Sequence, residues 1–193
     1  MMEGDRILFW KLTEAEHLRA RAFCRKLMGN RDDGDDLYHD TLIIALPRFC
    51  HLRDRSAFRP WLYRIAVNTF KNRFRRPWWK RLTPLTAEIE ESTSDGNPEA
   101  AQAARRRLEW AFRAITPEER ALVILFEMEG WTIAELVRLF GKNEGAIKVR
   151  LSRTRRKMRE AIVKRFHQSE AEPTVAAVES EDGICVAMKP RED

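Results

Sequence analysis

Cysteine and histidine are scarce in this chain of 193 residues, and neither type is spaced for metal binding. The three cysteines, Cys24, Cys50 and Cys185, form no Cys-x-x-Cys pair, and the four histidines form no His-Glu-x-x-His motif. An odd number of widely separated cysteines argues against a disulfide framework and against a structural zinc site. We therefore expect a protein of the reducing cytoplasm that needs no metal or other cofactor.

Long hydrophobic runs and catalytic motifs are also missing. No apolar run approaches the roughly 18–20 residues of a membrane helix, and the start MMEGDRILFWKL is too short and too acidic for a secretory signal. Glycine-rich phosphate-binding loops and the Gly-x-Ser-x-Gly motif of hydrolases do not occur. We expect no membrane insertion, and with no acid–base or metal constellation the chain is not expected to be an enzyme.

Basic charge, in contrast, is abundant and gathered in two blocks. Lys and Arg (36) exceed Asp and Glu (30), which gives a net charge of +6. Residues 59–81 hold eight bases and no acid, and residues 142–165 hold ten bases and two acids. Acid-rich stretches cover 32–40, 82–100 and 166–193. This alternation predicts two separate contacts with nucleic acid, although solvated helix faces would give a similar pattern.

Helix-start and helix-stop signals predict an all-α fold of two small helical domains. Capping boxes, prolines at first helical positions and glycine stops mark the helix ends. They predict helices over 13–28 (from the box Thr13–Glu16), 33–47, 59–76, from 98, from 116, over 132–140 and over 144–165. Residues 77–97 lose this periodicity and predict a flexible acidic linker between a domain of residues 10–76 and one of residues 98–166. An acidic extension, 167–193, follows.

The end of the second domain has the pattern of a helix-turn-helix. A short helix from Thr132 stops at Gly141, and Asn143 can cap the longer basic helix that follows. One apolar stripe is expected along that helix, made of Ile147, Leu151, Thr154, Met158 and Ile162. Bases fill its other faces and suit the major groove of DNA. A surface helix of a bundle is the alternative interpretation.

The basic helix of residues 59–76 has a different character. One polar stripe contains Arg64, Asn68, Lys71 and Arg75, and the opposite face offers Leu62, Ile65, Ala66 and Thr69 to a core. Aromatic residues lie around them, at Phe58, Trp61, Tyr63, Phe70 and Phe74. Bases interleaved with aromatic rings suit a single strand whose bases stack on the rings. Each aromatic residue, taken singly, also fits a core position.

Three motifs in this order resemble one protein family. Asp35-Asp-Leu-Tyr-His-Asp-Thr-Leu42 is similar to D-D-L-x-Q-E-x-F, and the run from Phe58 to Asn68 is nearly F-x-x-W-L-Y-R-I-A-x-N. Gly130–Glu135 with Glu144–Arg153 is similar to G-x-S-x-x-E-I-A and x-G-T-V-K-S-R-L-x-R. These are motifs of the group IV (extracytoplasmic-function, ECF) sigma factors of the sigma-70 family, and the resemblance covers roughly residues 10–165.

The resemblance implies a sigma region 2 bundle and a sigma region 4 helix-turn-helix. Together they would bind bacterial core RNA polymerase, recognise the −10 and −35 promoter elements and help to melt the DNA. It implies contacts to the β′ clamp helices from Asp35, Asp36, His39 and Asp40. Family members are often held inactive by an anti-sigma factor, so an anti-sigma factor is expected as a further partner.

The DNA-binding roles follow in the same way from the resemblance. Residues 48–58 would hold a flipped base of the −10 element. The single strand would run along Phe58, Trp61, Arg64, Asn68, Lys71 and Arg75. The −35 element would be read by Lys148, Val149, Ser152 and Arg153, with phosphate contacts from Arg150, Arg155 and Arg156. Val149 stands where the family often has serine; it cannot hydrogen-bond a base but can touch a thymine methyl group.

Two other classes of function account for less of the sequence. A free-standing helix-turn-helix regulator explains residues 118–165 but leaves the basic helix at 58–76 and the acidic segment 32–40 without a purpose. A protein-interaction module is compatible with all features and specific to none. The extension 167–193 can be a plain disordered tail. Alternatively, it can fold back on the basic helix, where its negative charge would moderate DNA binding.

Overall fold

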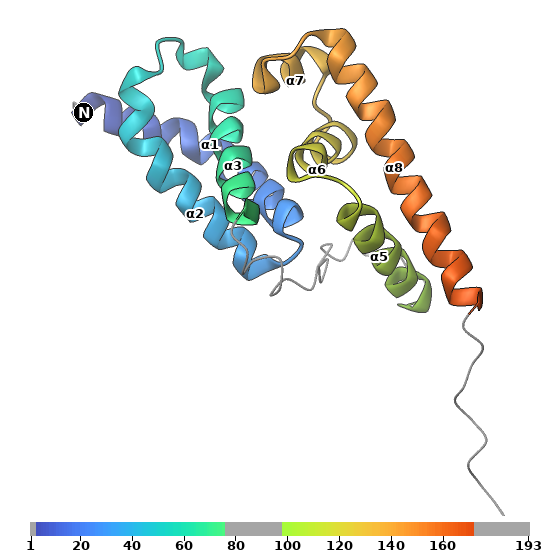
Figure 1. Ribbon diagram of the computed structural model, residues 1–193. Helices are drawn as coiled ribbons and strands as arrows, with labels where there is room; N and C mark the ends of the chain where they lie inside the picture. Colours follow the sequence, from blue (N-terminus) through green and yellow to red (C-terminus); the bar gives the residue numbers. More distant parts are fainter. Residues whose placement is uncertain (1–2, 76–97, 172–193) are drawn as a thin grey trace, which may run out of the picture.

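The computed structural model describes residues 3–75 and 98–171, and every regular element in these ranges is a helix (Figure 1). The first bundle contains α1 (Glu3–Met28), α2 (Arg31–Arg48) and α3 (Phe58–Arg75), with the short 3-10 turns η1 (Phe49–His51) and η2 (Arg55–Ala57) between α2 and α3. The second contains α5 (Pro98–Arg113), α6 (Pro117–Val123), the π-helical turn η3 (Ile124–Met128), α7 (Ile133–Phe140) and α8 (Glu144–Ala171). The predicted all-α fold is confirmed. The predicted linker, 77–97, and the extension from residue 172 onward lie outside the described residues.

The capping box predicted at Thr13–Glu16 is wrong, because α1 begins ten residues earlier, at Glu3. Phe9 is fully buried and packs edge-on against Phe49 and Phe58, with ring centroids 5.4 and 5.9 Å apart. This aromatic cluster anchors the first turns of α1 to the bundle. Thr13 consequently lies inside the helix with its side chain buried.

The two later capping boxes are confirmed, and they begin α6 and α7. At α6, the Glu119 amide donates to the Thr116 hydroxyl (3.2 Å), and the Thr116 amide donates to the Glu119 carboxylate (2.8 Å). Thr132 and Glu135 form the same reciprocal pair at the start of α7. Each box satisfies amides that the first turn of a helix leaves without partners.

The predicted helix-turn-helix is confirmed as well. Gly141 ends α7 in the left-handed conformation (φ 64°), and the Asn143 side chain accepts a hydrogen bond from the Ala146 amide (2.7 Å) at the start of α8. Ile147 and Leu151 of the predicted stripe are buried against the second bundle. The described part of α8 extends past the predicted end near residue 165.

Helices α1 and α2 come close together at Gly34. A Cβ atom placed on Gly34 would lie 2.4 Å from the Cα atom of Arg25, which is closer than two non-bonded carbon atoms can approach. Only glycine fits here, and the contact sets the distance between the two helices.

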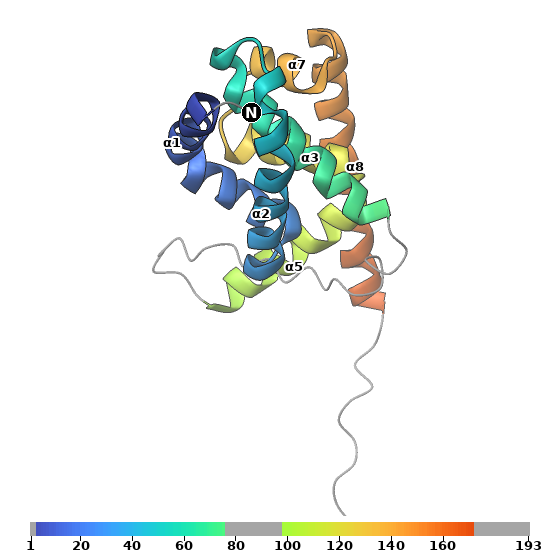
Figure 2. The same ribbon diagram turned by 90° about the vertical axis from the view of Figure 1, so that its left-hand side faces the viewer.

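The two bundles pack against each other mainly through α3, which contacts α6 and α7, and through α1, which contacts η3 and, at its last turn, Arg120 of α6. Both views show α6 and α7 beside α3 (Figure 1 and Figure 2). Among the described helices, none combines the length and the apolar character needed to cross a lipid bilayer.

Candidate nucleic-acid interface

The outer face of α8 presents a continuous basic surface, which we call the α8 face. Its side chains are all exposed: Lys148, Val149, Ser152, Arg153 and Arg156. Val149 is 49% exposed, so it places an apolar side chain within this basic surface. Lys148 and Arg156 pair with glutamates one turn away on the same helix, at 2.6 and 3.6 Å. Such exposed pairs contribute little free energy, and both bases remain available to an anionic ligand.

Arg150 and Arg155, also predicted to contact DNA, are engaged within the second bundle. Arg150 lies 3.1 Å from a Glu118 carboxylate oxygen, and Arg155 donates to Glu127 at 2.7 Å. Arg155 also lies over the Phe126 ring. These two arginines fix α8 to α6 and η3, at the edge of the α8 face.

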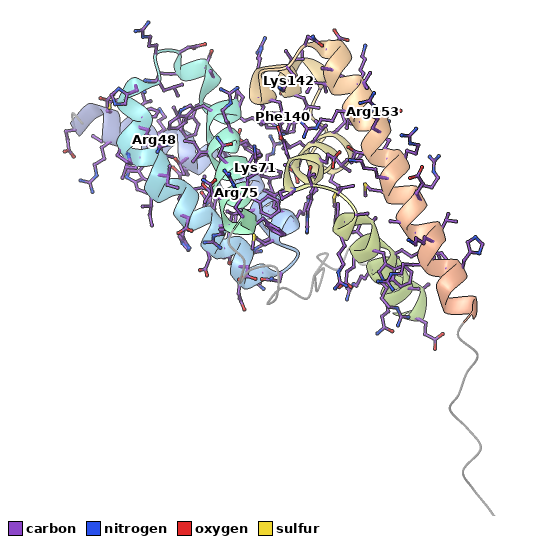
Figure 3. The ribbon with its side chains drawn as sticks, in the orientation of Figure 1. Arg48, Lys71, Arg75, Phe140, Lys142 and Arg153 are labelled. Carbon is purple, nitrogen blue, oxygen red and sulfur yellow. The ribbon has the colours of Figure 1, made fainter. Side chains whose placement is uncertain are left out.

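The polar stripe of α3 (Arg64, Asn68, Lys71 and Arg75) exists as predicted. Arg64, Asn68 and Arg75 are exposed, and Lys71 is half-buried beside α6. Figure 3 shows Lys71 and Arg75 on α3, and Arg153 well apart from them on α8. The opposite face of α3, with Leu62, Ile65, Ala66 and Thr69, is buried in the first bundle as predicted.

The aromatic residues around the stripe belong mainly to the core. Phe58 is only 3% exposed and is enclosed by Phe9, Phe49 and Trp61. We therefore remove Phe58 from the candidate strand-binding residues, because a base could stack on it only if this cluster came apart. Trp61 is partly exposed and keeps its place among the candidates.

Arg64 makes contacts that the sequence did not predict. Its guanidinium donates to the carbonyl oxygens of Leu139 (2.7 Å) and Arg138 (3.1 Å), in the last turn of α7. The final carbonyl groups of a helix have no partner within the helix and carry partial negative charge. Arg64 of the first bundle thus caps a helix of the second.

Arg120, on α6, makes the reciprocal contact. It donates to the Lys26 carbonyl oxygen (3.0 Å), in the last turn of α1, and its guanidinium lies 4.4 Å from the centre of the Phe112 ring. Burial, to 3% exposure, lowers the pKa of Arg120. Arg120 is not among the predicted site residues, because an arginine inside an amphipathic helix gives no sign of which carbonyl group it will reach.

Ion pairs surround the two arginine caps. Lys26 pairs with Glu129 (2.7 Å), Arg59 with Glu135 (3.4 Å), and Lys71 with Glu118 (3.7 Å). In each pair the base belongs to the first bundle and the acid to the second.

Glu118 bridges the two basic surfaces, since it pairs with Lys71 on α3 and Arg150 on α8. Burial raises the pKa of Glu118, but the hydrogen bond from Arg150 and the charges of Arg150, Lys71 and Lys142 outweigh it and hold that pKa below its ordinary value.

The acidic residues of α2 divide into two groups. Asp35 accepts hydrogen bonds from Arg21 (2.8 Å) and Arg25 (2.7 Å) of α1, which hold the pKa of its carboxyl well below the ordinary value. Asp40 pairs with Arg73 of α3. These two carboxylates are therefore occupied inside the first bundle.

Asp36 and His39, in contrast, are exposed on the outer face of α2. Ile43 lies on the same face and is 70% exposed. Ile43 is not among the predicted site residues. The available signal was its position on the helix, one turn beyond His39.

Comparisons with known proteins match both bundles to one family. The Sigma-70 region 2 model matches residues 12–80, and the Sigma-70, region 4 model matches residues 105–158. The ECF RNA polymerase sigma factor SigM of Mycobacterium tuberculosis is 30% identical over 155 residues, covering 80% of this chain and 77% of SigM. SigE of Mycolicibacterium smegmatis is 31% identical over 149 residues, covering 75% of this chain and 57% of SigE.

A solved structure shares the fold. It is the sigma factor RpoE in complex with the anti-sigma factor NepR from Bartonella quintana, with a TM-score of 0.57 and 22% identity. The similarity covers 80% of this chain and 96% of that one. Both halves of the chain match this family, so the family accounts for the first bundle as well as the second. A free-standing helix-turn-helix regulator would leave the first bundle without a role. The chain belongs to the sigma-70 family of RNA polymerase sigma factors, within its extracytoplasmic-function (ECF) group.

Proposed function

We propose that this sigma factor binds bacterial core RNA polymerase through α2, holds the melted −10 strand on α3 and reads the −35 duplex with α8. The observation that carries the proposal is the presence of two basic surfaces of different character on two bundles. The stripe on α3 has a partly exposed tryptophan beside it, whereas the α8 face belongs to a helix-turn-helix. The first suits a single strand and the second a major groove.

The polymerase contact is assigned to the exposed face of α2. Asp36, His39 and Ile43 offer charge, a hydrogen-bonding ring and an apolar side chain on one surface. Protein interfaces commonly combine a central apolar contact with a polar rim. Asp35 and Asp40 act indirectly, because their ion pairs hold α2 against α1 and α3.

The −10 strand is assigned to Trp61, Arg64, Asn68, Lys71 and Arg75. Residues 48–58 would hold a flipped base at the start of this path. Removing a base from the stack costs a few kcal/mol, which stacking and hydrogen bonds at the protein must offset.

The −35 element is assigned to the α8 face. Lys148, Ser152 and Arg153 can donate hydrogen bonds to base edges, and Val149 can touch a thymine methyl group. Arg150, Arg155 and Arg156 would contact phosphates. Arg150 and Arg155 would exchange their present glutamate partners for phosphate, or share them.

The protein would act in the cytoplasm with the polymerase, as a dissociable subunit rather than as an enzyme. An anti-sigma factor is the expected protein partner besides the polymerase. A solved structure with this fold contains one, which makes such a partner worth testing for here.

The test is promoter melting by reconstituted holoenzyme, on a promoter selected from a random-sequence library. Asn68→Ala is expected to reduce permanganate reactivity of −10 thymines while core binding stays unchanged. Gln102→Ala removes an exposed amide from α5 and serves as the matched control. Normal melting by Asn68→Ala would contradict the assignment of α3 to the strand.

A further inference from the structure

The first turns of α1 lie beside the loop between α2 and α3, residues 48–58, to which the proposed function assigns the flipped base of the −10 element. We propose that Asp5 is a positioning residue for recognition of this base: it holds Arg55, and Arg55 holds the loop. The inference rests on the proposed function of the loop. Asp5 precedes residues 12–80, so the match to the region 2 model assigns no role to it.

Arg55 makes three contacts that tie the loop together. Its guanidinium donates to the Asp5 carboxylate (2.8 Å) and to the Phe49 carbonyl oxygen, and it lies over the Phe49 ring, 3.9 Å from the ring centre. Phe49 begins η1 and Arg55 begins η2. A planar guanidinium with five donors can serve several acceptors at once. One side chain therefore joins the two turns of the loop to each other and to α1.

The aromatic cluster fixes the two ends of the loop. Phe49 and Phe58 are buried and pack edge-on against Phe9, which lies one helical turn after Asp5 on α1. Residues 50–57, between these ends, are all exposed or partly exposed. The middle of the loop therefore depends more on hydrogen bonds than on apolar packing.

Two hydrogen-bonding side chains project from this middle part. His51 and Arg53 are both exposed, and both can donate to the edge of a base. Asp54 accepts from the Ser56 amide (2.9 Å), a contact confined to the loop, whereas the contact of Arg55 with Asp5 reaches outside it. A flipped base is recognised by hydrogen bonds to its edge. A loop that is ordered before the base arrives loses less conformational entropy on binding.

The ion pair suits a local role better than a global one. Arg55 and Asp5 keep 32% and 26% of their side-chain surface exposed, and such pairs contribute little to the stability of a domain. Loops, however, open locally at a much lower free-energy cost than whole bundles unfold. Loss of the pair is therefore expected to change the order of the loop while the first bundle remains folded.

The test compares Asp5→Ala with Glu3→Ala. Both substitutions remove one carboxylate from the first turn of α1, and Glu3 is exposed, so Glu3→Ala is the matched control. Arg55→Ala and the double variant Asp5→Ala/Arg55→Ala complete the set. Circular dichroism melting of each variant checks that the chain remains folded.

Base recognition is measured with holoenzyme on promoters that differ only at one −10 position, which carries each of the four bases in turn. The preference is the ratio of the rates of open-complex formation on the best and the second-best base. We expect Asp5→Ala to lower this ratio about three- to tenfold at one position, and Glu3→Ala to leave every ratio unchanged. A general structural defect would slow opening on all promoters alike and would cancel in the ratio.

The double variant tests whether Asp5 acts through Arg55. Arg55→Ala is expected to lower the ratio at the same position at least as far, and Asp5→Ala should add nothing to it. The order of the loop is measured separately in the free chain, by electron paramagnetic resonance of a nitroxide on Cys50. Cys50 is exposed and Cys24 is buried, so the background carries only Cys185→Ser. Asp5→Ala and Arg55→Ala should raise the mobility of the nitroxide, and Glu3→Ala should not.

An unchanged ratio in Asp5→Ala would overturn the positioning role, and so would a loss that adds to that of Arg55→Ala or a nitroxide of unaltered mobility. A parent holoenzyme that opens promoters with no base preference in the −10 element would count against the proposed function of the loop. The nitroxide comparison would still decide whether Asp5 fixes the loop.

Discussion

Arg64 on α3 donates a hydrogen bond of 2.7 Å to the carbonyl oxygen of Leu139 at the end of α7. This bond joins the helix proposed to hold the −10 strand to the first helix of the helix-turn-helix. The guanidinium that caps α7 is therefore also one of the groups proposed to contact that strand.

Replacement of Gly34 tests the packing of α1 against α2. Gly34→Ala places a Cβ atom 2.4 Å from the Arg25 Cα atom, so the helices must move apart. We expect the free energy of unfolding to fall by about 2 kcal/mol and Tm to fall by about 4–8 °C, measured by thermal denaturation. Gly4→Ala, where no atom lies within 4 Å of the new Cβ, should not lower Tm. Equal changes in Tm from the two substitutions would show that the close contact at Gly34 does not determine how α1 packs against α2.

The sequence predicted those features of the fold that depend on neighbours along the chain. Thr116, Thr132, Gly141 and Asn143 act as predicted because their partners lie within three or four residues. The box at Thr13 failed because the residue that decides the helix start, Phe9, is held by distant rings.

The same distinction holds for the candidate sites. The stripe on α3 and the α8 face follow from helical periodicity. The partners of Arg64, Arg120 and Asp35 depend on how helices distant in sequence pack together, which periodicity does not reveal.

Asp35 is expected to make stability depend on pH. Because Arg21 and Arg25 hold its folded-state pKa below the unfolded value of about 3.9, its contribution is complete above that value and is lost as the pH falls toward the folded-state pKa. Asp35→Asn should cost about 2 kcal/mol at pH 7. The difference from the parent should shrink near pH 3. Urea denaturation at both pH values measures it, with exposed Asp32→Asn as the control. The same difference at both pH values would refute this role.

Charge reversal at Asp36 tests the polymerase surface. Asp36→Arg should weaken core binding about tenfold or more, because an exposed carboxylate of the proposed interface becomes a cation. Core affinity can be measured by fluorescence anisotropy of the labelled chain. Glu14→Arg makes the same change at an exposed position on α1 and should leave the affinity unaltered. If both reversals act alike, the docking surface is not on α2.

Arg153 tests recognition of the −35 element. Arg153→Ala should weaken the binding free energy for the preferred −35 duplex by about 1–3 kcal/mol. It should have a much smaller effect on a duplex that is altered at the contacted base pair. Arg106→Ala, which removes an exposed arginine from α5, is the control. Holoenzyme binding to the two duplexes, compared at one salt concentration, gives the difference. A loss that is equal on both sequences would make Arg153 a phosphate contact.

The most direct test of the central claim is binding of the purified chain to bacterial core RNA polymerase, with and without promoter-bearing DNA fragments. We expect tight binding to the core, and retention of specific fragments only when chain and core are both present. Sequence-specific DNA binding by the chain alone, with no binding to the core, would contradict the account.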